Sequence, residues 1–435
     1  MSFKETLQYL YGLGNEVSTM KLGLENIGKL LAALENPEKI YPKIQIAGTN
    51  GKGSTCAFLE AICLSARIKT GLTTSPHLIS ITERIKIGGR EISEKDFARH
   101  ATKIREISEK LISEKKLETF PTFFEQITAI ALSAFAEAKI ELAILETGLG
   151  GRFDAMTAAQ AEVVAITPID FDHQQILGDT IRLIAVEKAA IIRENTKVVV
   201  ARQKPEALSV ILERCAKLGI TPNLTNVEAE VIGTEDKKFI VGFQTEKAKY
   251  ENVKLNLSGR HQIENAKTAI LLAETLQENF NITTKNIIDG LQTAIHKGRL
   301  EFRENILFDG AHNISGAKAL KKFLDEFAEQ PVTFVFGAMK DKDLQEITKI
   351  LFTANSKIIL TKPNNSRAAS TAELINFLSA EINLKNVFQT EAVAEALKLA
   401  QEMASENDLI CVTGSLYLIG EAQKYLESSR NTTAC

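Results

Sequence analysis

Short apolar runs recur along the 435-residue chain, and each is followed by a turn containing glycine or acidic residues and then by a segment with helical spacing. In the first half these runs are KIQIAG, LAILETGLGG, EVVAITPIDFD and KVVVAR. The alternation predicts strand-loop-helix units, and hence an α/β fold with a mostly parallel sheet covered on both faces. Ligands bind at the carboxyl ends of strands in such sheets, so the loops after these runs are the candidate sites.

The pattern changes twice further along the chain. Residues 227–257 show short alternating runs separated by polar turns, which predicts a small antiparallel section, and a helix is expected over 263–277. A second α/β series then follows, comprising ILFDGAHN, VTFVFGAM, KIILTK, NVFQT and LICVTGS. We predict a larger domain over 1–295 and a smaller Rossmann-like α/β domain over 299–425, joined by a hinge at 296–298 within IHKGRLEF.

Composition and charge exclude several classes of protein. Hydrophobic residues make up 44% and charged residues 25% of the chain, which is typical of a globular protein. A formal net charge of −3 provides no general attraction to nucleic acid or to an anionic membrane. The five cysteines are scattered and show no C-x-x-C spacing, which argues against a disulfide framework and a zinc site. Without a signal peptide or a transmembrane run of ~20 residues, a cytoplasmic location is expected.

The sequence AGTNGKGST at 47–55 follows the first apolar run and raises the possibility of a phosphate-binding loop. The usual P-loop pattern would require glycine at Ile46 and a hydroxyl at Gly53, so the strict motif fails. The three glycines nevertheless allow successive N–H groups to face a polyphosphate, and a helix beginning near Ser54 adds its positive end. Lys52 could reach the β- and γ-phosphates. The alternative is a glycine-rich turn with an incidental lysine, but the strand-loop-helix context favours a P-loop-type ATPase domain.

Three polar residues at other strand ends are candidate metal ligands. Glu146 ends the run before GLGGRFDA, where NTPases place an acidic residue that holds Mg²⁺. Ser75 in TSPHL offers a hydroxyl, and His173, which follows Asp170 and Asp172, could complete the shell of a second Mg²⁺. Each has an ordinary alternative, namely a capping carboxylate, a turn serine and a solvated loop histidine.

Adjacent aromatic residues open a predicted helix in TFPTFFEQITAI. Phe123 and Phe124 would by default belong to the core of an α/β protein. The functional alternative is a flat platform for a fused heterocycle, with Thr122 and Glu125 forming hydrogen bonds to its edge.

A lysine and a second group of polar residues complete the candidates. Lys188 lies in a helix with small and apolar neighbours in AVEKAAII. It is either solvated or, if desolvated, neutral enough to react with CO₂ and become a carbamate. Asp309 and His312 follow a predicted strand of the second domain, which would place them in a cleft closed by the two domains. The same half supplies Arg260, Asn265, Arg299 and Asn313.

Ten motifs occur in a fixed order along the chain: AGTNGKGST, TSPHL, TFFEQ, LETGLGGRFDA, FDHQQILG, EKAAI, GRHQIENA, GRLE, DGAHN and DKD. Together they resemble the folylpolyglutamate synthase/dihydrofolate synthase family of the Mur ligase superfamily, over about residues 20–420. The resemblance implies an ATP-dependent amide ligase. A folate-type carboxylate would attack the γ-phosphate to form an acyl phosphate, and the amine of L-glutamate would displace phosphate.

The resemblance also implies roles for individual positions. Those of the ATP site are Thr49, Asn50, Gly51, Lys52, Gly53, Ser54, Asn265, Arg299 and Asp309. Ser75, Glu146 and His173 would bind two Mg²⁺ ions, and Lys188 would be carbamylated. His312 would lie near the acyl phosphate, which with Lys52 and Lys188 makes three catalytic candidates. The pterin-site positions are Thr122, Phe123, Phe124, Glu125, Phe153, Asp154 and Ala155.

The chain departs from the family pattern at three places, which leaves alternatives open. The family sequence DATN appears here as Asp154-Ala155-Met156-Thr157, LPGR appears as HKGR, and Lys21 stands where enzymes that accept dihydropteroate often carry an acidic residue. A bifunctional enzyme using 7,8-dihydropteroate and tetrahydrofolate is expected. The alternatives are a folylpolyglutamate synthase only, or another Mur-type amino-acid ligase.

The partners expected from the resemblance are small molecules, with no nucleic acid and no membrane, and the protein is expected to be a monomer. A ligase for cell-wall nucleotide precursors is less favoured, because a P-loop starting near residue 48 leaves no room for a preceding uridine-nucleotide domain. A non-catalytic nucleotide switch would not require Lys188, His312 or a second α/β domain.

Overall fold

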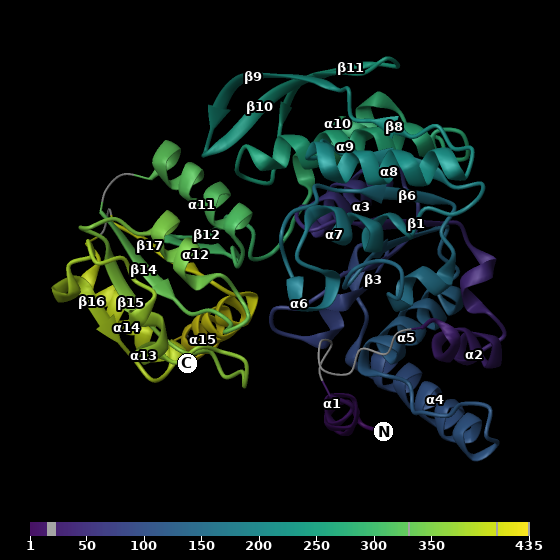
Figure 1. The fold of residues 1–435 in the computed structure, drawn as a ribbon, viewed down its shortest axis with the longest axis horizontal. Coiled ribbons are helices and arrows are strands. Elements are labelled where there is room, and N and C mark those ends of the chain that lie inside the picture. Colours follow the sequence, from purple (N-terminus) through teal and green to yellow (C-terminus); the bar gives the residue numbers. More distant parts are fainter. Residues whose placement is uncertain (15–22, 329–330, 406–407, 434–435) are drawn as a thin grey trace.

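The computed structural model describes residues 1–14, 23–328, 331–405 and 408–433, which form two lobes that lie side by side (Figure 1). Within these residues the larger lobe holds an eight-stranded and a three-stranded sheet, and the smaller lobe holds a six-stranded sheet. The predicted α/β fold, with mostly parallel sheets and a small antiparallel section, is confirmed.

The eight-stranded sheet organises the larger lobe. Its strands are β1 (Lys43–Ala47), β2 (Thr70–Thr73), β3 (Ile85–Ile87), β4 (Arg90–Glu91), β5 (Leu142–Glu146), β6 (Val163–Ile166), β7 (Lys197–Val200) and β8 (Asn223–Leu224). Their order is β4-β3-β2-β5-β1-β6-β7-β8. Strands β2, β5, β1, β6, β7 and β8 pair in parallel. Strands β3 and β4 pair antiparallel and form one edge of the sheet. The carboxyl ends of β1, β2, β5 and β6 therefore lie at one edge of the sheet, next to one another.

Helices cover both faces of this sheet. They are α1 (Phe3–Gly12), α2 (Glu25–Ala33), α3 (Lys52–Ser65), α4 (Glu94–Ser113), α5 (Phe123–Glu137), α6 (Gln174–Leu177), α7 (Ile181–Ala189), α8 (Pro205–Lys217), α9 (His261–Leu276) and α10 (Thr284–Thr293), with 3₁₀ turns at Pro37–Ile40, Ile81–Arg84 and Ala155–Ala159. Strand side chains alternate between the two layers. Ile144 packs with α3, α9 and α10, whereas its neighbours Ala143 and Leu145 pack with α2, α4 and α5. A fully buried parallel strand therefore reads as a continuous apolar run, as the sequence indicated.

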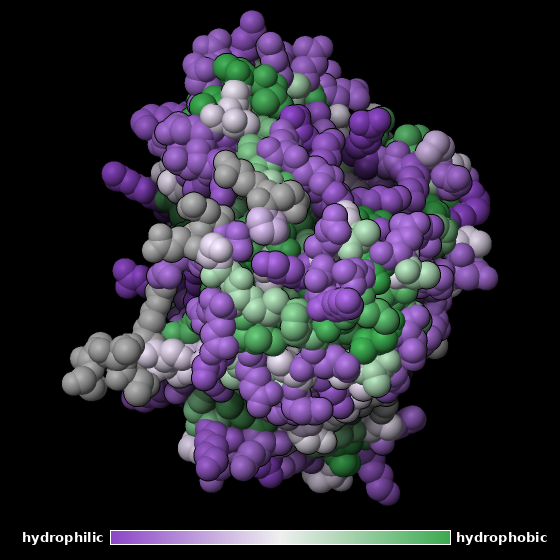
Figure 2. Space-filling view, turned by 90° about the vertical axis from the view of Figure 1, so that its left-hand side faces the viewer, coloured by the Kyte–Doolittle hydropathy of each residue, from purple (hydrophilic) through white to green (hydrophobic). Residues whose placement is uncertain are grey.

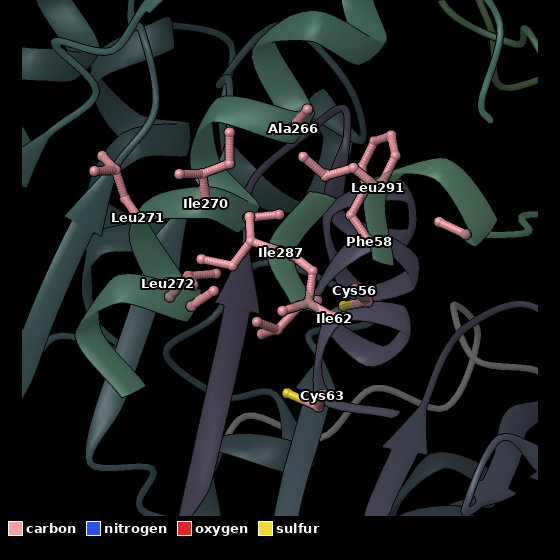
Figure 3. Close-up of a cluster of buried hydrophobic side chains, with 14 of the residues drawn as sticks. Cys56, Phe58, Ile62, Cys63, Ala266, Ile270, Leu271, Leu272, Ile287 and Leu291 are labelled. Carbon is pink, nitrogen blue, oxygen red and sulfur yellow. The ribbon is translucent and has the colours of Figure 1, made fainter. Parts of the chain in front are cut away.

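Helices α3, α9 and α10 form a tightly packed layer (Figure 3). Phe58 and Ile62 of α3 lie against Ile270 of α9 and Leu291 of α10. The closest approach is at Gly290, where a Cβ atom would lie 2.4 Å from the backbone N and Cα of Ile62. Backbone atoms cannot move aside as a side chain can, so α10 can approach α3 this closely only because residue 290 is glycine.

We predict that Gly290→Ala will destabilise the protein by about 1–3 kcal/mol, because the added methyl group overpacks the contact with α3. The matched control is Gly28→Ala in α2, where a Cβ would meet nothing within 4 Å. That change should instead stabilise the helix by about 0.5–1 kcal/mol. Thermal unfolding of the two variants measures both effects, and an unfolding temperature for Gly290→Ala at or above that of the parent would contradict the packing argument.

The smaller lobe contains a six-stranded sheet with helices on both faces. Its strands are β12 (Glu301–Arg303), β13 (Ile306–Asp309), β14 (Val332–Phe336), β15 (Lys357–Leu360), β16 (Val387–Gln389) and β17 (Leu409–Thr413), in the order β12-β13-β17-β14-β15-β16. β12 pairs antiparallel with β13, and the other pairs are parallel. The helices are α11 (Ile314–Phe327), α12 (Leu344–Leu351), α13 (Thr371–Asn376), α14 (Val393–Met403) and α15 (Leu416–Thr433), with a 3₁₀ turn at Leu384–Asn386.

Helices α11 and α12 cover one face of this sheet, and α14 and α15 cover the other. Figure 2 views the molecule from the side of this lobe and shows hydrophilic residues over much of the surface, interrupted by smaller hydrophobic groups. Isolated groups of this kind are normal for a folded surface.

The predicted antiparallel section is a three-stranded sheet that reaches toward the smaller lobe (Figure 1). It consists of β9 (Glu228–Glu235), β10 (Lys238–Gln244) and β11 (Lys249–Lys254), paired antiparallel in the order β11-β10-β9. The ring of Phe239 in β10 packs edge-on against Phe327 of α11, with 5.5 Å between centroids. Arg260 also forms two hydrogen bonds with Glu326 of α11. The lobes are therefore in contact away from the segment 296–298.

Across the described parts of the chain, no helix has both the length and the hydrophobicity needed to cross a membrane.

Candidate active site

The loop between β1 and α3 is shaped by glycines at positions where a side chain could not fit. Gly48 has φ +151°, and a Cβ there would lie 1.9 Å from Oγ1 of Thr167. Gly51 has φ +86° and caps α3, and its Cβ would lie 2.2 Å from Oδ1 of Asn265. Both positions combine a positive φ with a close contact, which is why glycine is required. The loop thus lies directly against the first turns of α9, as a compact turn leading into a helix N-terminus.

Two lysine ammonium groups converge on the carbonyl of Gly48. Lys52 Nζ lies 3.2 Å from the carbonyl oxygens of Gly48 and Thr49, and Lys188 Nζ donates to the Gly48 oxygen at 2.8 Å. Lys188 is buried in α7. Burial, followed by the charge of Lys52, lowers the pKa of Lys188 to about 7. A large fraction of this amine is therefore neutral at neutral pH, unlike an ordinary lysine.

The three predicted metal ligands lie at or after the carboxyl ends of β2, β5 and β6, which are at the same edge of the sheet. Ser75 follows β2, Glu146 ends β5, and the backbone N–H of Ser75 donates to Oε2 of Glu146 at 3.0 Å. Burial raises the pKa of Glu146, opposed by the charge of Lys52. His173 follows β6, and burial lowers its pKa to about 4, which keeps the imidazole neutral and able to coordinate.

This donor set fits a magnesium ion bound with phosphate. Hydroxyl and carboxylate oxygens are the ligands Mg²⁺ prefers, while the imidazole of His173 is less usual. Among the residues the structure describes, no three His, Cys, Asp or Glu side chains form a metal-binding group of their own. Ser75, Glu146 and His173 come as single side chains from separate strand ends, an arrangement that is common where substrate phosphates and water complete a magnesium shell.

Asp172 connects the larger lobe to the smaller one. Its carboxylate lies 2.7 Å from Lys342 Nζ and 3.7 Å from His312 Nε2. Nδ1 of His312 lies 2.7 Å from the carbonyl oxygen of Gly310, so Nδ1 carries the proton. Burial acts to raise the pKa of Asp172, but His312, His173 and Lys342 outweigh it and hold the pKa well below its usual range. Asp172 is thus ionised within a cluster of three basic groups.

Residues of the smaller lobe face the loop between β1 and α3 across the same cavity. Both carboxylate oxygens of Asp309 accept backbone hydrogen bonds of 3.0 Å, one from Leu300 and one from Ala311. Arg299 donates to the carbonyl of Gly310 at 3.1 Å. Burial raises the pKa of Asp309, and the charge of Arg299 opposes this. The carboxylate is therefore held in one orientation at the end of β13.

One cavity between the lobes brings together all the residues predicted for ATP, metal and catalysis. Its walls include the loop residues Thr49, Asn50, Gly51, Lys52, Gly53 and Ser54, together with Ser75, Glu146, His173, Lys188, Asn265, Arg299, Asp309 and His312. Asn313, the N-cap residue of α11, donates to Asn50 Oδ1 at 3.0 Å across this cavity. The side chains thus come from both lobes, as expected for a cleft closed by two domains.

A second cavity, more apolar than the first, adjoins it. Six of the seven residues predicted for the pterin site line it: Thr122, Phe124, Glu125, Phe153, Asp154 and Ala155. Phe123 is the exception, because its ring is only 3% exposed and lies in the core, stacked 6.1 Å from the ring of Tyr11. The sequence left open whether these two rings belong to the core or line a binding site. Phe123 belongs to the core, and Phe124 lines the cavity.

Two of the polar residues at this cavity also have structural roles. Thr122 and Glu125 form the capping box of α5, with hydrogen bonds of 2.8 and 3.3 Å between each backbone N–H and the other side chain. Asp154 accepts from the N–H groups of Leu149 and Met156 and so fixes the loop after β5.

Lys21 lies outside the described residues. It is the residue that left the expected dual specificity open in the sequence.

Several lining residues were not predicted from the sequence. Lys342 and Arg367 bring positive charge to the second cavity, and Tyr417 adds an aromatic ring. Lys342 lies inside the DKD motif, so the sequence marked its position, but no role was predicted for it. His296 and His261 line the first cavity. His261 lies in GRHQIENA and His296 in HKGR, but no role was predicted for either residue.

The two cavities share wall residues, which include Ser75, His173 and His312. The glycine-rich loop before α3, the side chains at the ends of β2 and β5 and an apolar pocket thus meet at one junction.

Comparison with known proteins identifies this arrangement. Residues 46–273 match the Mur ligase middle domain, and residues 296–425 match the C-terminal domain of dihydrofolate synthetase. The dihydrofolate synthase/folylpolyglutamate synthase of Bacillus subtilis (strain 168) is 36% identical over 420 residues, which cover 94% of this chain and 96% of that protein.

Solved structures agree. The Mycobacterium tuberculosis folylpolyglutamate synthase complexed with ADP and AMPPCP has a TM-score of 0.89 at 29% identity, covering 97% of this chain and 98% of that one. The Yersinia pestis bifunctional folylpolyglutamate synthase/dihydrofolate synthase complexed with AMPPNP and Mn ion has a TM-score of 0.84 at 28% identity, covering 98% of each.

The fold and the paired cavities define an ATP-dependent ligase of the Mur type. The chain belongs to the dihydrofolate synthase/folylpolyglutamate synthase family.

Proposed function

We propose that this enzyme is bifunctional, adding L-glutamate to 7,8-dihydropteroate and to tetrahydrofolate at the expense of ATP. The observation that carries the proposal is the junction of the two cavities, whose shared walls include Ser75, His173 and His312. A flat heterocycle in the apolar cavity would direct its carboxylate toward that junction, where the γ-phosphate of ATP would lie.

The reaction requires the carboxylate to be activated. Its oxygen attacks the γ-phosphorus, the bond to the β–γ bridging oxygen breaks, and ADP leaves. The amine of glutamate then attacks the acyl carbon, and the carbon–oxygen bond to phosphate breaks to leave an amide. Activation is needed because a free carboxylate is a poor acceptor for an amine, whereas phosphate is a good leaving group.

The proposed nucleotide contacts come from both lobes. Lys52 would place its ammonium on the β- and γ-phosphates, beside the backbone N–H groups at the start of α3. Asn265, Arg299 and Asp309 would hold the remainder of ATP, consistent with their places around the cavity. His312, whose Nε2 points toward Asp172, would face the acyl phosphate.

Ser75, Glu146 and His173 would hold Mg²⁺, in up to two sites. When bound, the metal would spread the negative charge of the two anions that must meet. Binding of a divalent metal is supported by the manganese in the Yersinia pestis relative.

Lys188 would be carbamylated. Its lowered pKa supplies a neutral amine, and an amine attacking CO₂ loses a proton to become an anion. That anion would lie in the same cavity as the proposed metal ligands.

The apolar cavity offers complementary walls for the other two substrates. Phe124 and Phe153 would contact the pterin. Arg367 and Lys342 of the smaller lobe bring cationic groups to the opposite wall, and these suit the carboxylates of glutamate. This division supports a domain boundary at the proposed hinge 296–298. A monomer in the cytoplasm completes the proposal. The cysteines within the described ranges, Cys56, Cys63, Cys215 and Cys411, are buried and free, which suits a reducing compartment.

Labelled glutamate, MgATP and purified protein test the bifunctional proposal directly. Incorporation is expected with dihydropteroate and with tetrahydrofolate in separate reactions. Incorporation with tetrahydrofolate alone would reduce the enzyme to a folylpolyglutamate synthase, and incorporation with neither would refute the folate assignment for this chain.

A further inference from the structure

His296 joins residues 296–298, the segment between the two lobes (the interlobe segment), to the first turn of α3 through a hydrogen bond to Ser54. Nδ1 of His296 lies 3.0 Å from Oγ of Ser54, two residues after Lys52. The imidazole also packs on the loop backbone, because a Cβ at Gly53 would lie 2.7 Å from its Cε1 and 2.8 Å from its Nε2. The ring therefore fills the space that a side chain at residue 53 would need.

Three buried polar side chains fix the direction of this hydrogen bond. Oε1 of Gln262 accepts from Nδ2 of Asn265 at 2.8 Å, so Nε2 of Gln262 is the atom that faces Ser54, to which it donates at 3.1 Å. The Ser54 oxygen thus accepts one hydrogen bond, and its own proton is directed to Nδ1 of His296. Burial and the nearby charge of Arg299 lower the pKa of His296 to about 3, which keeps the imidazole neutral. With the Ser54 proton directed at Nδ1, the one ring proton lies on Nε2.

The position of His296 in the chain gives the contact a consequence for ATP. Arg299 follows three residues later and lines the nucleotide cavity together with Ser54. We propose that His296 is a positioning residue for the nucleotide: by accepting the Ser54 proton, it holds the interlobe segment against the nucleotide loop and sets Arg299 beside ATP. The inference rests on the nucleotide site proposed above and not on the identity of the folate substrate.

Replacement of His296 should weaken nucleotide binding selectively. We expect His296→Leu, which cannot accept a hydrogen bond, to raise the KM for ATP and the Kd for ADP by about 3- to 10-fold. The KM values for glutamate and the folate substrate should stay within about twofold of the parent. His296→Asn places Oδ1 near the position of Nδ1 and should restore ADP binding, whereas His296→Gln places its polar group one carbon further out and should not.

Lys297→Ala is the matched control, because Lys297 is the next residue and pairs with Glu91 at 3.4 Å on the surface. It should leave the Kd for ADP unchanged. Ser54→Ala removes the same hydrogen bond from the other side, and it tests the proposal even if His296→Leu does not fold. In the Ser54→Ala background, His296→Leu should cause no further loss of ADP binding.

Titration calorimetry with MgADP reads these effects without any folate substrate, so failure of the folate assignment would leave the test intact. An unchanged Kd in His296→Leu would overturn the proposal. So would an equal rise of all three KM values, or additive losses in the double variant, since each would indicate a general structural role.

Discussion

Lys188→Ala is expected to lower kcat/KM by at least about 100-fold, the size of effect seen when one preorganised electrostatic group is removed from an active site. The physical basis is the buried amine whose pKa is about 7 and which would be a carbamate in the working enzyme. Small carboxylates such as acetate or formate, added to the variant, should restore part of the rate by supplying an anion where the carbamate would lie. Initial rates of glutamate incorporation measure both the loss and the recovery.

The controls for this prediction separate the carbamate from other roles of the lysine. Sodium chloride at the same ionic strength should give no recovery, which excludes a general salt effect. Because protonation of the amine competes with carbamate formation, the parent enzyme should lose activity as the pH falls below about 7. A Lys188→Ala variant with full activity would show that the carbamate is not needed.

Glu146→Gln should have a comparable effect on the rate and a different effect on stability. The substitution keeps the shape and removes the charge that would hold the metal, so we expect kcat to fall by about 100-fold or more. Burial raises the pKa of Glu146, which means that the folded protein favours the protonated carboxyl more than the unfolded chain does. The ionised form therefore costs stability at neutral pH, and glutamine should leave the unfolding temperature unchanged or raise it.

Glu141→Gln is the matched control for this change. Glu141 lies just before β5, at the opposite end of the strand from Glu146, and accepts from the backbone of Lys69. Its replacement should leave the rate unchanged. Retention of activity within a few fold in Glu146→Gln, measured across a range of magnesium concentrations, would contradict the proposed ligand.

The fold could be predicted because its dominant signals are local. The apolar runs that became β1, β5, β6 and β7 are buried apart from Lys197 and consist mainly of apolar residues. The turns after them carry most of the polar groups. The alternating pattern of β10 likewise revealed its half-buried antiparallel setting. Strand ends could be located in this way, and the residues there converge because parallel strands end at the same edge.

The parts that could not be predicted depend on contacts between distant residues. Phe123 and Phe124 are chemically identical neighbours, and only the packing of α5 decides that one ring enters the core and the other meets Gly148 at the cavity. The charge cluster around Asp172 requires Lys342, which is 170 residues away in the chain. His296 lies in HKGR, but its contact could not be predicted from that motif, because the contact depends on where Ser54 lies in space.

The close contact between α10 and α3 has a mechanical consequence. α3 begins at Lys52, and α10 ends at Thr293, three residues before His296. Because Gly290 lies against the backbone of Ile62, α3 and α10 are packed into one rigid unit. That unit carries both the loop before α3 and the chain that leads from α10 into residues 296–298. If the smaller lobe rotated about residues 296–298, the loop between β1 and α3 would keep its position in the larger lobe. The side chains that change position relative to bound ATP would then be Arg299 and Asp309.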